Sequence, residues 1–127
     1  MTPLVASGTT WTPRENARAW YGLDSSSDGT KLAAVVQNGQ IYTSTDSGVL
    51  WTARESNRNW RAIASGADGT KLAAIVQNGR IYTSTDSGVT WTARESSRNW
   101  YGIASSADGN KLAATSYSGQ IYTSTDA

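Results

Sequence analysis

Short apolar runs separated by turn residues recur along the chain with a period of 40 residues. Four kinds of run follow one another in each period, and they start at positions 20, 60 and 100; 31, 71 and 111; 41, 81 and 121; and near 51 and 91. The second kind is continuously apolar at its centre, as in Leu32-Ala-Ala-Val-Val36. No segment carries an apolar stripe at helical spacing over three turns. The pattern therefore predicts strands and no helix.

Turn residues stand between these runs. Asp-Gly follows the first run at positions 28, 68 and 108, and Asn-Gly follows the second at 38 and 78, with Ser118-Gly119 in the last period. Asn-Gly between apolar runs is typical of a two-residue hairpin with positive φ at both residues. A polar stretch, 54–59, is expected to be the connection to the next first run.

A strand that is apolar along its whole length is buried on both faces of its sheet. Four hairpin-linked strands per period of 40 residues, buried on both faces, favour the blades of a β-propeller. The expected fold is all-β, with four-stranded antiparallel blades and three blades per chain. Helical and leucine-rich solenoids are disfavoured because turn residues recur about every eight to twelve positions.

One eight-residue motif, Ser-x-Asp-x-Gly-x-x-Trp, lies between the third and fourth runs. It is complete twice and split once, with its second half near the start of the sequence and its first half near the end. Its residues are Ser44, Asp46, Gly48 and Trp51; Ser84, Asp86, Gly88 and Trp91; Ser124 and Asp126; and Ser7, Gly8 and Trp11.

This spacing resembles the Asp-box, or BNR, repeat. The resemblance covers nearly all of residues 7–127 and implies a β-propeller with each box in the hairpin between the third and fourth strands of a blade. The close similarity of the repeats also resembles engineered symmetric propellers. The absence of histidine, cysteine and phenylalanine suits an engineered, reconstructed or recently amplified sequence.

The chemistry of the motif favours a structural role. Asp46 and Asp86 can accept hydrogen bonds from backbone N–H groups of their own loop. Gly48 can adopt positive φ, and Trp51 can anchor the hairpin between sheets. The alternative, a cation or substrate bound by the aspartates, is less favoured because one carboxylate per loop gives too few ligands for calcium.

The split motif suggests how the chain assembles. Residues 1–6 are expected to be a tail and residues 7–127 three 40-residue blades. Three blades cannot close a propeller, which has about four to eight. Residues 9–14 of a neighbouring chain would supply the fourth strand of the last blade, in a head-to-tail contact that closes a ring. A homotrimer with nine blades is slightly preferred over a homodimer with six.

Composition narrows the function. The 127 residues carry a net charge of +1, without a basic stripe, so nucleic acid is not an expected partner. The lack of cysteine excludes disulfides, and the lack of histidine removes the commonest general base and transition-metal ligand. No metal, cofactor or membrane is expected, and no targeting signal is found, so the expected location is cytoplasmic or recombinant.

Two ligand-directed alternatives remain open. A sialidase-like glycosidase would need a tyrosine nucleophile, a carboxylic acid and an arginine cluster. Residues of those types are Tyr21, Tyr101, Asp24, Glu55, Glu95, Arg58 and Arg98. Most recur identically in every repeat, whereas a catalytic site combines different residues from different blades, so the expectation is no enzyme and no catalytic residue.

A lectin-like face is the other alternative. Glycans could meet a repeated set of arginines and tryptophans, namely Arg18, Arg58, Arg98, Trp20, Trp60 and Trp100. The competing interpretation is a solvated loop with Arg–Glu pairs of little energetic weight and tryptophans buried between blades. Arg61, Arg80 and Tyr117 depart from the repeat without an assigned role.

Overall fold

The computed structural model describes residues 10–127, which form seven strands and no helix. The expected tail, residues 1–6, and the motif residues Ser7 and Gly8 lie outside the described part. The strands are β1 (Trp20–Ser25), β2 (Leu32–Ser44), β3 (Thr52–Ser65), β4 (Leu72–Ser84), β5 (Thr92–Ser105), β6 (Leu112–Ser116) and β7 (Ile121–Ser124). The all-β prediction is confirmed.

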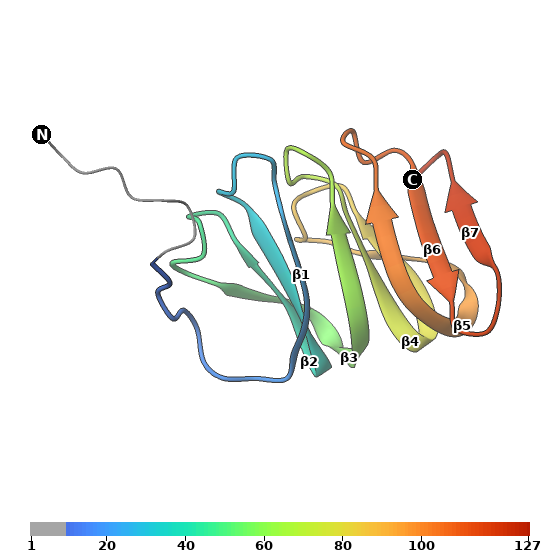
Figure 1. Cartoon of the computed structure of the whole chain (residues 1–127), viewed down its shortest axis with the longest axis horizontal. Coiled ribbons are helices and arrows are strands. Elements are labelled where there is room, and N and C mark those ends of the chain that lie inside the picture. The colour runs from blue at the N-terminus through green and yellow to red at the C-terminus, as the bar shows by residue number, and fades with distance from the viewer. Residues whose placement is uncertain (1–9) are drawn as a thin grey trace, which may run out of the picture.

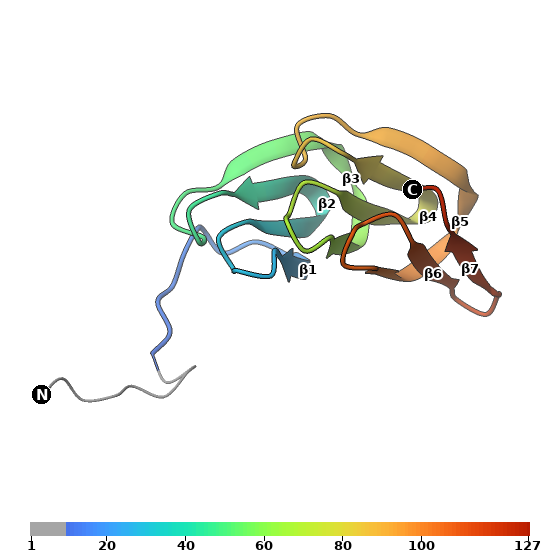
Figure 2. The same ribbon diagram turned by 90° about the horizontal axis from the view of Figure 1, so that it is seen from above.

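Neighbouring strands pair antiparallel in strict chain order, from β1 to β7. They group into three sheet units (Figure 1). The first unit contains β1, β2 and the beginning of β3; the second contains the rest of β3, β4 and the beginning of β5; the third contains the rest of β5, β6 and β7. Seen from above, the units fan out side by side (Figure 2).

The turn between the second and third predicted strands differs from the expected type. In the third unit it separates β6 from β7, and in the other units it lies within the long β2 and β4. In the first unit, Asn38 has a positive φ of 56°, whereas Gly39 does not have the positive φ that the expected turn type needs at both residues. Glycine is needed for space instead: a Cβ on Gly39 would lie 2.7 Å from Val36 Cγ1.

The predicted polar connection at 54–59 is part of a strand. β3 runs without interruption through it, pairing Arg58 with Gly39 and Asn59 with Gln37 of the hairpin tip. One residue later, Trp60 pairs with Val76 of the second unit. Polarity identified the segment as exposed, but the pairing of its last two residues with the neighbouring hairpin extends the strand.

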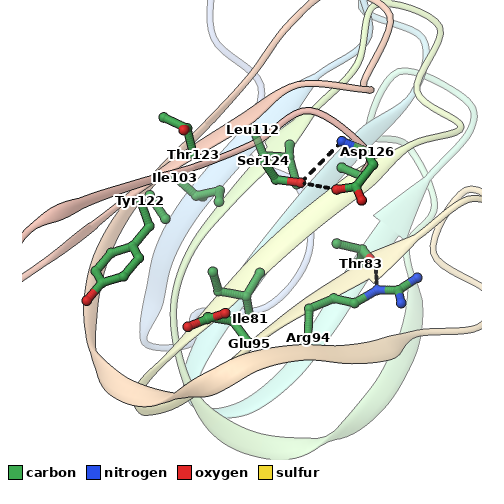
Figure 3. Close-up of a pocket in the computed structure, with 12 residues that line it drawn as sticks. Ile81, Thr83, Arg94, Glu95, Ile103, Leu112, Tyr122, Thr123, Ser124 and Asp126 are labelled. Carbon is green, nitrogen blue, oxygen red and sulfur yellow. Dashed lines mark hydrogen bonds between the residues drawn. The ribbon is translucent and has the colours of Figure 1, made fainter.

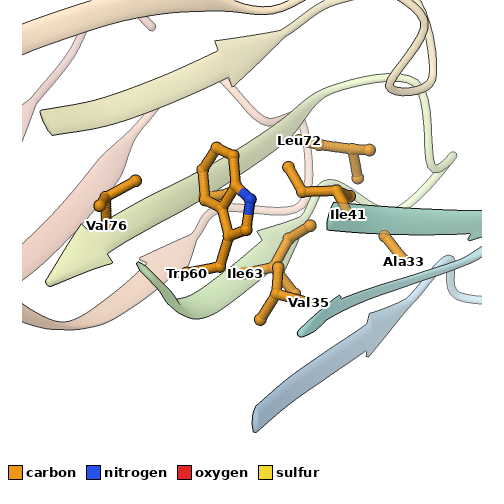
Figure 4. Packing of buried hydrophobic residues seen from close by; sticks show 8 residues of the cluster. Ala33, Val35, Ile41, Trp60, Ile63, Leu72 and Val76 are labelled. Atoms are coloured by element: carbon orange, nitrogen blue, oxygen red, sulfur yellow. The ribbon is translucent and has the colours of Figure 1, made fainter. Parts of the chain in front are cut away.

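The main core lies between the first and second units. Val35, Ile41 and Trp60 have no exposed surface, and they pack with Ile63 and Leu72 (Figure 4). A second cluster between the second and third units is built from Ile75, Ile81, Trp100 and Ala114. Burying each large side chain contributes about 1.5–3 kcal/mol. The apolar centres of β2 and β4 are buried, as the continuous pattern predicts.

Backbone contacts also join the units. Ser27 N–H donates to the Ala67 carbonyl at 2.7 Å, and Ala67 N–H donates to the Ala107 carbonyl at 2.7 Å. Near the start of β1, a Cβ on Gly22 would lie 3.2 Å from the Ala62 Cα. The first strands of successive units therefore approach one another closely, and each unit repeats the contact made by the one before it.

Candidate functional site

The two complete Ser-x-Asp-x-Gly-x-x-Trp motifs, residues 44–51 and 84–91, form closed hydrogen-bonded loops. Ser44 Oγ donates to Asp46 Oδ1 at 2.8 Å and accepts from Gly48 N–H at 2.9 Å. Asp46 Oδ1 also accepts from Leu50 N–H at 2.9 Å. Trp51 Nε1 donates to the Gly48 carbonyl at 2.8 Å. The first loop thus uses its serine, aspartate and tryptophan to hold its own backbone.

Backbone conformation explains the residues of these loops. Gly48 has φ of 89°, as predicted for the motif glycine. Ser47 has φ of 62°, a left-handed conformation that the sequence did not reveal at a serine. The Ser47 N–H donates to the Thr30 carbonyl at 2.9 Å, so the loop is tied to the turn that follows β1.

The loop aspartates are ionised acceptors. Hydrogen bonds from the Thr90 hydroxyl, the Thr90 N–H and the Ser84 hydroxyl lower the pKa of Asp86 from 3.8 to about 2. The Leu50 N–H and the Ser44 hydroxyl likewise lower the pKa of Asp46. These carboxylates are poor proton donors and weak bases, which suits a structural role better than acid–base chemistry.

Acidification is expected to destabilise the second loop, residues 84–91, and the hydrogen bonds from Thr90 are expected to determine the pH range over which this happens. Because the folded-state pKa of Asp86 lies below its usual 3.8, the stability it contributes is present above that value and is lost as the pH falls toward 2. Thr90→Leu introduces the residue found at position 50 and removes the largest cause of the shift. NMR titration of the Asp86 carboxyl should show a higher pKa in Thr90→Leu. An unchanged pKa would show that the hydroxyl does not set it.

The loops do not assemble a cation site among the described residues. Residues 10–127 contain no group of three or more acidic, histidine or cysteine side chains able to hold a metal ion. They also contain no helix of the length and apolarity needed to cross a membrane. In the half motif after β7, Ser124 Oγ donates to Asp126 Oδ1 at 2.9 Å, as in the complete loops.

The arginines and tryptophans predicted as a ligand face contact tyrosines of the same chain in three similar stacks. In the second unit, the Arg58 guanidinium lies 4.7 Å from the Tyr82 ring centroid, and Trp60 meets Tyr82 edge-on at 5.3 Å. Arg58 also pairs with Glu55 at 3.1 Å. The same arrangement joins Arg18, Tyr42, Trp20 and Glu15, and joins Arg98, Tyr122, Trp100 and Glu95.

These stacks leave little tryptophan surface that a glycan could contact. Trp60 and Trp100 have no exposed surface, so neither can stack on a sugar as the lectin hypothesis requires. Trp60 Nε1 donates to the Ser56 carbonyl at 3.2 Å, which satisfies its polar group inside the protein. The tyrosines of the stacks were missed as partners, although their fixed spacing from the tryptophans was visible in the sequence.

Asp24, the one candidate acid that breaks the repeat, serves the backbone. Its Oδ1 accepts from Ser25 N–H at 2.8 Å, and its Oδ2 accepts from Ser65 N–H of the second unit at 2.8 Å. Both oxygens are thus engaged with main-chain donors. The side chain therefore links the first and second units through hydrogen bonds, which is a structural role and not that of a general acid.

A cavity of about 340 Å³ opens beside β7 (Figure 3). Its walls include Ile103, Leu112, Ala114 and Tyr122 of the third unit. Figure 3 also shows Ile81 and Arg94 of the second unit across the hollow. In the second unit, Trp91 and Tyr82 pack against the core cluster that includes Leu72 and Ala74, which are the repeat counterparts of Leu112 and Ala114.

The opposite end of the fan carries a second hollow, of about 420 Å³, lined by Trp20, Tyr21, Leu23 and Trp51. Leu23 is 65% exposed there, whereas its counterpart Ile63 is buried. At the β7 end, Ile121 is 72% exposed, whereas its counterpart Ile41 is fully buried. The same sequence position is therefore core in one unit and surface in another.

Comparison with known proteins supports the architecture. No family model matches the sequence, and no curated protein matches it. Among solved structures, YCF48 from Cyanidioschyzon merolae is similar with a TM-score of 0.73 and 20% identity, over 88% of this chain and 35% of that one. The Niastella koreensis GH74 enzyme is similar with a TM-score of 0.66 and 28% identity, over 91% and 17%.

A third solved structure is the β-propeller domain of Myceliophteria thermophila Cps50 (Swd1), with a TM-score of 0.70 and 13% identity over 89% of this chain and 37% of that one. The chain thus covers between 17% and 37% of the length of each of these three structures. These likenesses define the chain as a partial β-propeller of antiparallel sheets. The Asp-box assignment of its loops stays a prediction.

Proposed function

We propose that this chain is a non-catalytic, self-assembling β-propeller repeat protein whose copies join head to tail into a closed ring. The observation that carries the proposal is the pair of open faces at the two ends of the fan. Leu23 lies on one face and Ile121 on the other, and both are large, exposed and apolar. Soluble proteins seldom leave such patches uncovered.

The internal contacts indicate how the faces would fit. Ile41 and Ile63 share the core between the first and second units. Ile81 and Ile103 meet in the same way between the second and third units. Ile121 and Leu23 are the next pair in this series, so one copy's Ile121 would pack on the Leu23 of a second copy. Such a contact joins different surfaces of identical chains, and rotation can close it into a ring.

Strand donation would complete the contact. The cavity beside β7 is lined by Leu112 and Ala114, the repeat counterparts of Leu72 and Ala74 in the core cluster against which Trp91 packs. Trp11 stands 40 positions before Trp51 in the repeat and is 84% exposed. We expect residues 9–14 of one copy to pair with β7 of another, placing Trp11 in this cavity. Three copies are the preferred ring, with two as the alternative.

The remaining chemistry supports a structural role. The described carboxyl groups with a shifted pKa all shift downward through turn hydrogen bonds. The candidate acid Asp24 holds two backbone N–H groups. Near-identical repeats fit an engineered or reconstructed origin. No substrate or cofactor is part of the proposal.

Ile121→Asp tests the proposed contact. The substitution is expected to leave each chain folded, because Ile121 is mostly exposed within one chain, and to break the ring by burying an unpaired charge. Light scattering should then give the mass of one 13.5 kDa chain. Val89→Asp makes the same chemical change at an exposed loop position and should leave the ring intact.

A second substitution tests whether Ile121 of one copy meets Leu23 of the next. Leu23→Lys in the same chain as Ile121→Asp would bring opposite charges together at every junction, and part of the assembly should return. An Ile121→Asp protein with the native mass of the unmodified protein would contradict the proposal. Failure of the double variant to assemble better than either single variant would contradict the assigned pairing of Ile121 with Leu23.

A further inference from the structure

Arg61 is held between tyrosines of the two neighbouring units. Its guanidinium carbon lies 4.6 Å from the Tyr21 ring centroid and 4.1 Å from the Tyr101 ring centroid. Tyr21, Arg61 and Tyr101 occupy the same position in β1, β3 and β5, so the cluster is built across three sheet units. Only its central member is an arginine.

The other arginine–tyrosine stacks show what this cluster lacks. Arg18, Arg58 and Arg98 each lie over a tyrosine and each pair with a glutamate. The Arg61 side chain makes neither a hydrogen bond nor an ion pair within residues 10–127. Its buried Nε has no partner, as is also true of the Nε atoms of Arg58 and Arg98, so the difference lies in the missing carboxylate. Residues 10–127 therefore contain three arginine–tyrosine stacks completed by a carboxylate and one cluster without it.

Stacking leaves the edge of the guanidinium for recognition. The two rings lie against the guanidinium and restrict its orientation, while the donors of its terminal Nη groups lie in its plane. Planar donors of this kind match the two oxygens of a carboxylate. Prior ordering by the tyrosines reduces the entropy that Arg61 would lose on binding.

An aromatic surface adjoins the arginine. The Tyr101 and Tyr117 rings lie 5.4 Å apart, and Tyr117 is 61% exposed. Tyr117 replaces the glutamine present at positions 37 and 77. Two of the departures from the repeat, Arg61 and Tyr117, thus contribute to one surface, with Tyr101 in contact with both.

We propose that Tyr21, Arg61, Tyr101 and Tyr117 form a binding site for an organic carboxylate with a planar ring. The carboxylate pairs with the Arg61 edge, and the ring packs on Tyr101 and Tyr117. All four residues belong to one chain, so the site can be tested in the single-chain Ile121→Asp background, where its failure is distinguishable from failure of the proposed assembly.

The test is a calorimetric and NMR titration with sodium benzoate, acetate and inorganic phosphate at constant ionic strength. Benzoate should bind more tightly than acetate and shift the Arg61 Nε–H resonance. Arg61→Tyr, which introduces the residue of positions 21 and 101, should weaken benzoate binding about tenfold or more through loss of a charged hydrogen bond. Tyr117→Gln should weaken benzoate binding while leaving acetate binding unchanged.

Arg80→Gln is the matched control. It also removes one positive charge and introduces a repeat residue, that of positions 40 and 120, and it should leave benzoate binding within about twofold. Equal losses in Arg61→Tyr and Arg80→Gln would overturn the site, since only net charge would then matter. Phosphate binding more tightly than benzoate would also overturn it, because the aromatic surface would play no part.

Discussion

Replacing Trp11 with alanine is expected to convert assembled rings into single chains at micromolar concentration. In the proposed ring, this side chain fills the cavity of about 340 Å³ beside β7 of the next copy. Loss of a buried tryptophan costs about 3–5 kcal/mol, and the loss would occur at every junction. Light scattering over a dilution series would measure the change in mass.

Leu50→Thr is the matched control for Trp11→Ala. Leu50 is also exposed and apolar, and threonine is the residue at the equivalent position 90. This variant should keep the mass of the unmodified protein at every concentration. If Trp11→Ala dissociates no more readily than Leu50→Thr, donation of Trp11 to a neighbour is wrong.

The largest expected effect on the stability of a single chain is that of Trp60→Ala. Trp60 is fully buried between two units and meets Tyr82 edge-on at 5.3 Å. Its removal should lower the free energy of unfolding by about 3–5 kcal/mol, because the lost contacts leave a cavity that neighbouring strands cannot close. Urea unfolding in the Ile121→Asp background would measure this loss without a contribution from assembly.

Trp60→Phe separates packing from hydrogen bonding. Phenylalanine keeps an aromatic ring against Tyr82 but removes the Nε1–H donor that bonds to the Ser56 carbonyl at 3.2 Å. Its destabilisation should be smaller than that of alanine. A loss below about 1 kcal/mol for Trp60→Ala would contradict the central place of Trp60 in the core.

Local chemistry made much of the fold predictable. The apolar runs and Asp-Gly turns predicted β1 at Trp20–Ser25 and the antiparallel pairing across each Asp-Gly turn. Where the sequence misled, long-range pairing was the cause. The polar stretch at 54–59 is strand because the hairpin tip of β2 lies beside it, and polarity carries no information about such a partner.

Side-chain roles were predictable where they are local. Asp46 and Gly48 act within their own loop as expected, since their partners lie a few residues away. The stacking of Arg58 on Tyr82 joins residues 24 positions apart in adjacent strands, which periodicity alone cannot pair. Arg61 could be recognised as a departure from the repeat, but its place between Tyr21 and Tyr101 required the fold.

The open faces also required the structure. Leu23 and Ile63 are similar side chains at the same repeat position, and the sequence does not distinguish their environments. Their different exposure depends on whether a preceding sheet unit covers them. The number of repeats alone suggests assembly only by analogy with other propellers. The difference in exposure adds a physical argument, because it identifies two exposed apolar faces whose counterparts pack together inside the chain.

The most direct test of the assembly is the native mass of the unmodified 127-residue protein, measured by light scattering behind a size-exclusion column. The proposed ring predicts a single species with the mass of three 13.5 kDa chains, or of two in the smaller alternative, without larger aggregates. A single species with the mass of one chain at all concentrations would contradict ring closure and strand donation together.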